Sequence, residues 1–203
     1  MPSSSTFSVT LLCALTAWSG PAAAGGIGLV GTTGFHSARL YYYDADGKQY
    51  LNSQVLPNNG GGLELVLGDK DDKLLGVARG FYLLDASVHD PADPLVADPI
   101  YVLPEGPMHL GVATVGLHWG VLGDPTAFQA HLAAHVGAGV LTVDSGTGEG
   151  ANLEFLLGEI GAGVQYHFEK NVQIYADVAF AARFRKDISL GGTGYLGVRY
   201  MFD

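Results

Sequence analysis

The stretch GYLGVRYMF, residues 194–202, decides the fold that this sequence predicts. Successive side chains of an extended strand point to opposite faces, so alternate residues share a face. One face of this stretch is purely apolar and aromatic, with Leu196, Val198, Tyr200 and Phe202. The other face includes a charge and a glycine, with Tyr195, Gly197, Arg199 and Met201. We therefore predict a β-strand that has one apolar face and one mixed face.

The same alternation recurs from residue 25 onward, in segments separated by turn signals. Further strands are predicted at residues 26–35, 61–67 and 74–85, and on both sides of the last two short turns, which brings the total to eight. Four long connections, at residues 37–59, 87–107, 144–152 and 185–192, alternate with three short turns, at residues 69–73, 123–126 and 169–171. Within the first long connection, the Asp46-Gly47 pair predicts a strand-turn-strand extension over residues 41–50.

An even number of antiparallel strands brings the last strand beside the first and closes the sheet without free edges. Long connections at one end and short turns at the other are the layout of an outer-membrane barrel. The predicted fold class is all-β, an eight-stranded antiparallel up-and-down transmembrane β-barrel.

The short turn at residues 123–126 predicts a register between its two strands. It sets Leu117 opposite Leu132 on the apolar face, and His118 opposite His131 on the polar face. A slip of one residue would send one strand's whole apolar set to the other face, so the faces are strongly specified.

The composition favours lipid around this barrel. The chain has 203 residues, of which 48% are hydrophobic and 15% charged, yet no run reaches the roughly 18 to 20 apolar residues of a transmembrane helix. A soluble lipocalin-like barrel or a sandwich would show the same alternation with its apolar face turned inward. The polar faces, however, combine isolated charges with many glycines. Aromatic residues near strand ends suit interfacial girdles: Phe35, Trp119, Phe128, Tyr166, Phe168, Phe184, Tyr200 and Phe202.

The first 24 residues are predicted to be a cleaved signal peptide. Residues 9–18 are apolar, and Ala22, Ala23 and Ala24 supply a small-residue cleavage site, so residues 25–203 form the predicted barrel domain. The single cysteine, Cys13, lies inside this signal. The mature chain then has no disulfide, no thiolate metal site and no cysteine nucleophile.

The charge balance argues against nucleic acid as a partner. Ten Lys and Arg residues face 20 Asp and Glu residues, which gives a formal net charge of −10 and a pI near 4.9. A nucleic-acid binder needs clustered cations that displace counterions.

The last strand, with Phe202 as the penultimate residue, resembles the closing strand of bacterial outer-membrane barrels, which typically ends in a terminal Phe. The whole layout resembles small barrels of the OmpA-domain and OmpW type. This resemblance implies a location in the bacterial outer membrane, contact with outer-membrane lipid and lipopolysaccharide, and recognition by the barrel-assembly machinery. It implies a structural or surface-interaction role through the external loops. The alternatives are a narrow channel for small or apolar solutes, as in OmpW, and a lipid-modifying enzyme.

An eight-stranded barrel is only just wide enough for its interior side chains, so enclosed charges need partners. We expect Glu64 and Arg79 to be diagonal neighbours on one face, and Glu159 and Arg183 likewise. A plug of ion pairs and hydrogen bonds is favoured over a conducting lumen. The predicted interior network is Glu64, Arg79, His118, His131, His135, Glu159, Asp177, Arg183 and Arg199, with His167, Gln173 and Tyr175 as further inward polar residues.

The external connections supply the candidate contact surfaces. The first connection is rich in tyrosine, and the second has three Asp-Pro pairs that predict an irregular loop. The candidate contact residues are Tyr41, Tyr42, Tyr43, Asp90, Asp93 and Asp98. The identity of a surface or envelope protein partner stays open.

The sequence predicts no metal, no cofactor and no catalytic site. His131 and His135 are four residues apart along a strand, about 13 Å, which is too far to share an ion. His118 and His131 could approach each other, but no third ligand is evident. Ser87 and His89 have a spacing that permits contact, yet they do not match the His-x-Ser motif of the outer-membrane lipid A deacylases.

Overall fold

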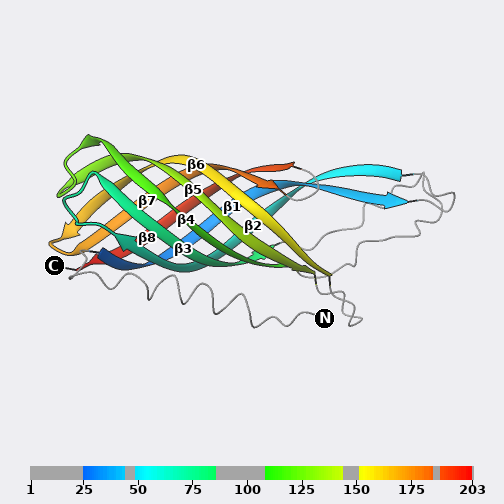
Figure 1. Ribbon diagram of the computed structural model, residues 1–203, viewed down its shortest axis with the longest axis horizontal. Coiled ribbons are helices and arrows are strands. Elements are labelled where there is room, and N and C mark those ends of the chain that lie inside the picture. The colour runs from blue at the N-terminus through cyan, green and yellow to red at the C-terminus, as the bar shows by residue number, and fades with distance from the viewer. Residues whose placement is uncertain (1–24, 44–48, 86–107, 144–150, 185–187, 203) are drawn as a thin grey trace.

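The computed structural model describes residues 25–43, 49–85, 108–143, 151–184 and 188–202. Over these residues the chain forms a closed antiparallel barrel in which each strand pairs with its neighbours in sequence and the last strand pairs with the first (Figure 1). The strands are β1 (Gly25–Tyr43), β2 (Gln49–Leu67), β3 (Leu74–Asp85), β4 (Met108–Gly123), β5 (Phe128–Val143), β6 (Ala151–Glu169), β7 (Val172–Phe184) and β8 (Ile188–Met201). The predicted fold class is confirmed.

Within the described part of the chain, no helix has both the length and the apolar character that crossing a bilayer requires. The predicted signal peptide, residues 1–24, lies outside the described residues.

The strands β1 and β2 are much longer than predicted. Both have 19 residues, so most of the predicted connection at residues 37–59 is paired strand. The predicted strand-turn-strand extension is present, with Tyr43 paired to Gln49 across residues 44–48, which lie outside the described set. Pro57 lies inside β2, at a position where no described residue pairs with β2 on its β3 side, since pairing with β3 begins at Asn58. A proline is tolerated at such an edge because its missing N–H has no partner to lose.

The predicted connection at residues 185–192 is also longer than the observed one. The strand β8 begins at Ile188, so only residues 185–187 separate it from β7.

The register predicted between β4 and β5 is wrong by two residues. Leu117 pairs with Ala134 and His118 with Ala133, and a bulge lies between Gly120 and Leu122. A shift of two preserves the face of every side chain, so the predicted faces are correct although the partners are not. Next to the turn Leu122 pairs with Ala130 rather than Ala127, and the bulge reduces this difference from three residues to two. The turn signal alone revealed neither the longer turn nor the bulge.

The turn between β4 and β5 is fixed by Asp124. Its Oδ1 accepts hydrogen bonds from the Thr126 amide at 2.9 Å and from the Thr126 hydroxyl at 2.7 Å. These bonds favour the charged carboxylate, and they hold the pKa of Asp124 below its usual range. Gly123 precedes the turn with a φ of +89°, a conformation that suits glycine.

The outer surface of the barrel is apolar. Val178 is 69% exposed, whereas the adjacent Asp177 is 4% exposed. Trp119 and Leu117 also point outward, each more than half exposed, and so does Phe180. All eight predicted girdle aromatics are exposed as well. A soluble barrel would pack these side chains into its core, so the soluble alternative is wrong for this molecule.

The interior has apolar ends and a polar middle. One apolar cluster, which includes Phe81, Leu83 and Leu110, lies toward the long connections. A second cluster, which includes Leu75 and Met201, lies toward the short turns. Between them lies a layer of buried charged and polar side chains, which we call the interior network: Glu64, Arg79, His118, His131, His135, Glu159, Tyr175, Asp177, Tyr195 and Arg199.

Candidate functional site

Glu64 is the centre of the interior network. It lies on β2 directly opposite Arg79 on β3, whose Nε donates to its Oε2 at 2.6 Å. Arg199 on β8 donates from Nε to the other carboxylate oxygen, and the Tyr175 hydroxyl on β7 donates to Oε2 at 2.9 Å. The predicted diagonal arrangement of Glu64 and Arg79 is therefore wrong, because the two residues oppose each other. One carboxylate thus holds side chains from three other strands.

Arg79 extends the network across the barrel. Its Nη2 donates to Asp177 Oδ2 at 2.7 Å, while Asp177 Oδ1 lies 2.9 Å from His131 Nε2. The two guanidinium groups also lie over aromatic rings, Arg79 at 4.7 Å from the Tyr195 centroid and Arg199 at 3.9 Å from the Tyr175 centroid. A continuous chain of charge-assisted contacts therefore joins β2, β3, β7 and β5.

Gly163 allows His131 and Asp177 to meet although they lie on non-adjacent strands. It pairs with His131 on one side and with Asp177 on the other. A Cβ atom at position 163 would lie 2.1 Å from Asp177 Oδ1. The space that a side chain would fill on β6 is therefore where the imidazole and the carboxylate make contact.

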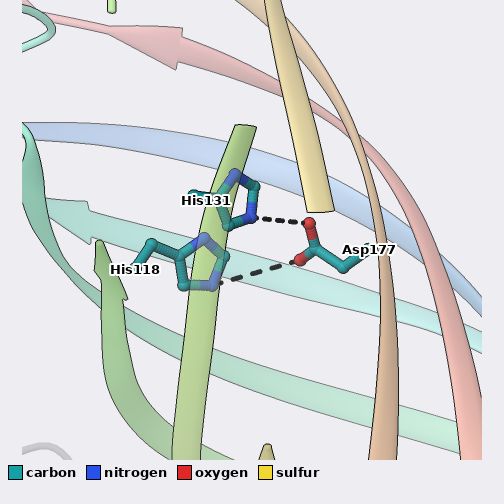
Figure 2. A group of neighbouring side chains, drawn as sticks. All are labelled: His118, His131 and Asp177. Atoms are coloured by element: carbon teal, nitrogen blue, oxygen red, sulfur yellow. Dashed lines mark hydrogen bonds and ion pairs between the residues drawn. The ribbon is translucent and has the colours of Figure 1, made fainter. Parts of the chain in front are cut away.

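The three histidines of the network converge because of the observed register. His118 pairs with Ala133, which is midway between His131 and His135. The His118 ring stacks on His131 with centroids 4.6 Å apart, and its Nε2 lies 3.0 Å from His135 Nε2. Figure 2 shows His118 and His131 turned toward Asp177, with 4.0 Å between His118 Nε2 and Asp177 Oδ2. Asp177 was predicted to lie in the interior, but its closeness to the two imidazoles was not predicted from the sequence.

Glu159 and Arg183 lie nearer the long connections. Glu159 is buried, and its Oε1 accepts a hydrogen bond from the Tyr195 hydroxyl at 2.7 Å. Arg183 is opposite Leu157, which makes it diagonal to Glu159 as expected, and its guanidinium lies 5.3 Å from the Phe155 centroid. The role of Tyr195 was missed, although its place on the same face as Arg199 was the available signal.

The two other polar residues that were predicted to point inward, His167 and Gln173, contact each other. Gln173 lies 2.6 Å from His167, Nε2 to Nε2, near the short-turn end. The candidate residues Asp90, Asp93 and Asp98, and also Ser87 and His89, lie outside the described residues.

The network fills the interior of the barrel at this level. Arg199, Tyr175, His118, His131 and Glu64 are among the largest fully buried side chains. The cavity beside them, lined by Arg79, His135, Glu159, Asp177 and Tyr195 among others, has a volume of about 10 Å³, which is room for about one water molecule. Such packing suits a rigid, closed barrel.

A second candidate feature is an extension of β1 and β2 beyond the end of the barrel at which the long connections lie. Strand β1 pairs with β8 only as far as His36, and β2 pairs with β3 only from Asn58. Among the described residues, 38–43 and 49–54 therefore pair only with each other, and Figure 1 shows them extending past the other strands. We call this two-stranded extension the ribbon. Six residues of strand correspond to about 20 Å. The ribbon contains the candidate residues Tyr41, Tyr42 and Tyr43.

Comparisons with known proteins show the same fold. No protein-family model and no curated protein matches the chain. Ail, the attachment invasion locus protein of Yersinia pestis, is similar in structure, with 16% identity and a TM-score of 0.51 over 89% of this chain and 99% of Ail. Ail has also been solved in complex with the heparin analogue sucrose octasulfate. Neisserial surface protein A is similar with 14% identity and a TM-score of 0.51, over 86% of this chain and 97% of that protein.

At identities this low, the structural similarity establishes a shared fold and nothing finer. The shared fold agrees with the closed barrel, the apolar exterior and the enclosed charges described above. A sheet that spans lipid must satisfy its backbone by closing on itself, and it must face hydrocarbon with apolar side chains. The chain therefore has the fold and the lipid-facing surface of the small eight-stranded β-barrels of the bacterial outer membrane.

Proposed function

We propose that this barrel is a surface-interaction protein, in which a closed barrel anchors the ribbon outside the membrane. The observation that supports the proposal is that residues 38–43 and 49–54 pair with each other beyond the last pairs that the described parts of β8 and β3 make with β1 and β2. Outer-membrane barrels turn their short turns to the periplasm and their long connections outward. The ribbon is at the end of the long connections, so it projects away from the cell.

The filled interior favours this function over a channel. Two arginines and two carboxylates, Glu64 and Asp177, make ion pairs across the lumen. A solute path would require these buried pairs to separate, at a cost of several kcal/mol for each uncompensated charge. We infer a non-catalytic role.

The same proposal includes the partners that the barrel type implies. The apolar exterior would contact outer-membrane lipid, with lipopolysaccharide on the side of the ribbon. The alternating apolar residues of β8 would be read by the barrel-assembly machinery. Ail binds a polyanionic heparin analogue in its complex. The formal charge of this chain is −10, so we expect its partner not to be a polyanion.

Shortening the ribbon tests the proposal. Replacing residues 38–54 by Asn-Gly would join Ser37 to Val55, which are already paired, through a two-residue hairpin loop. We expect bacteria that display the full chain to attach to cultured epithelial cells or to one another more than cells with an empty vector, and the shortened variant to lose this gain. A second variant, with Tyr41, Tyr42 and Tyr43 changed to Ser, is expected to lose it too.

The control is a test that the shortened variant still folds as a barrel. The shortened variant should keep the heat-dependent gel mobility of a folded barrel, because residues 38–43 and 49–54 make no strand pairing with the other described strands. Attachment that is equal with and without the ribbon would contradict the proposal. Conductance of the full chain in planar bilayers would favour the channel instead.

A further inference from the structure

His118, His131 and Asp177 form a compact group of metal-ligand side chains inside the barrel (Figure 2). They come from β4, β5 and β7, and one ligand atom from each lies within 4.8 Å of the others. All three are at most 4% exposed. His135, also buried, presents its Nε2 at 3.0 Å from His118 Nε2. Three imidazoles and one carboxylate therefore converge from three strands.

The spacing of these atoms is close to that of a tetrahedral site. Zinc binds histidine nitrogen and carboxylate oxygen at about 2.0–2.2 Å, which puts the donor atoms of a tetrahedral site roughly 3.3 Å apart. The distances here are 2.9 Å for His131 Nε2 to Asp177 Oδ1, 3.0 Å between the Nε2 atoms of His118 and His135, and 4.0 Å for His118 Nε2 to Asp177 Oδ2. Small side-chain adjustments would bring the ligand atoms of His118, His131 and Asp177, which all lie within 4.8 Å of one another, to a single ion.

The surroundings hold the ligands in place. Arg79 Nη2 donates to Asp177 Oδ2, and a supporting hydrogen bond of this kind orients a ligating carboxylate. An ion would displace the 3.4 Å contact between Arg79 Nη2 and His118 Nε2, while Glu64 still holds Arg79 through Nε. The cavity of about 10 Å³ beside Asp177 and His135 gives room for such a movement.

The charge around the group also permits a cation. The interior network has three carboxyl groups, those of Glu64, Glu159 and Asp177, against the guanidinium groups of Arg79 and Arg199. Glu159 lines the cavity, and its Oε2 is buried without a hydrogen-bond partner among the described residues. A carboxylate oxygen in this position favours a positive charge nearby.

We propose that His118, His131 and Asp177 bind a divalent transition-metal ion of the zinc class within the barrel. Imidazole with a single carboxylate selects zinc and its neighbours over magnesium and calcium, which prefer all-oxygen sites. Because the group is sealed from solvent, the ion enters while the barrel folds. Once bound, it ties β4, β5 and β7 together and stabilises the folded barrel over the unfolded chain.

Metal analysis of the refolded protein tests this site. The mature chain is refolded from urea into detergent micelles with Zn²⁺, or with Mg²⁺ in a parallel sample, and free ions are removed. We expect one equivalent of zinc per folded chain, no retained magnesium, and a higher thermal midpoint in the zinc sample. His131→Gln keeps a side chain that can donate to Asp177, and it should reduce zinc affinity by more than the roughly 10–100-fold typical of residues that only support a ligand.

The matched control is His167→Gln, which removes a histidine that contacts Gln173 rather than the group. It should retain the full equivalent. Asp177→Asn, checked for folding by heat-dependent gel mobility, should lose zinc as His131→Gln does. The proposal fails if the folded wild type retains less than one equivalent. It also fails if His131→Gln retains zinc as the wild type does, or if His167→Gln loses it equally.

Discussion

Glu64→Gln is expected to destabilise the folded barrel by about 3–5 kcal/mol, the cost of removing one partner from a buried ion pair. Glu64 is fully buried and accepts from Arg79, Arg199 and Tyr175. Arg79 keeps Asp177 as a partner after the change. Arg199 has no second carboxylate among the described residues, so its charge would stay buried and uncompensated. Urea unfolding in lipid vesicles or micelles measures the free energy of unfolding.

The double variant Glu64→Leu with Arg199→Met separates two explanations of that loss. It removes the orphaned charge together with its partner, and buried ion pairs replaced by apolar residues of similar volume are often neutral or stabilising. We expect it to be markedly more stable than Glu64→Gln. A double variant as unstable as the single one would mean that the loss comes from the hydrogen bonds that the Glu64 carboxylate accepts from Arg79 and Tyr175, rather than from the uncompensated charge of Arg199.

Val178→Arg is expected to cost about 2–4 kcal/mol in a bilayer, the penalty for a cation on the lipid face near the midplane of a barrel. Val178 points outward with 69% of its side chain exposed, and it lies at the middle of β7 beside Asp177. In a protein surrounded by water, an arginine at such a position would be nearly neutral. Unfolding of the barrel in lipid vesicles measures the difference.

Leu122→Arg is the matched control for depth. Leu122 is 71% exposed, as outward as Val178, but it lies one residue before the end of β4 at a short turn. Near the interface the same change costs only about 0–1 kcal/mol, because the guanidinium reaches the headgroups. Equal penalties at the two positions would contradict the lipid-facing assignment.

The faces of the strands could be predicted because they depend on a local rule. Alternation along β6 and β7 places Ile160 and Val178 outward and Gln165 and Asp177 inward, and this holds in the structure. The long connections were harder to delimit. The sequence predicts a connection at residues 37–59, because it does not reveal that β1 and β2 continue to pair with each other beyond their pairs with β8 and β3.

The side-chain contacts inside the barrel depend on how several strands pair, and the local sequence does not determine this pairing. Leu122 pairs with Ala130 instead of the predicted Ala127, and the bulge between Gly120 and Leu122 takes back one of these three residues, so His118 lies between His131 and His135 rather than opposite His131. The approach of Asp177 to His131 needed two registers at once, one on each side of Gly163. A pattern within one pair of strands does not include both registers, so the sequence did not predict that Asp177 joins His118 and His131 in the proposed metal site.

Fluorescence quenching of Trp119 by lipids with brominated acyl chains tests the orientation of the barrel most directly. The chain has two tryptophans, and the other one, Trp18, lies in the predicted signal peptide, so the mature chain from residue 25 has Trp119 alone. Trp119 is 57% exposed on the outer face, close to the short turn that ends β4. We predict strong quenching by brominated lipid and weak quenching by iodide in the water. Strong quenching by iodide with none from the lipid would contradict a barrel whose apolar face is turned to the membrane.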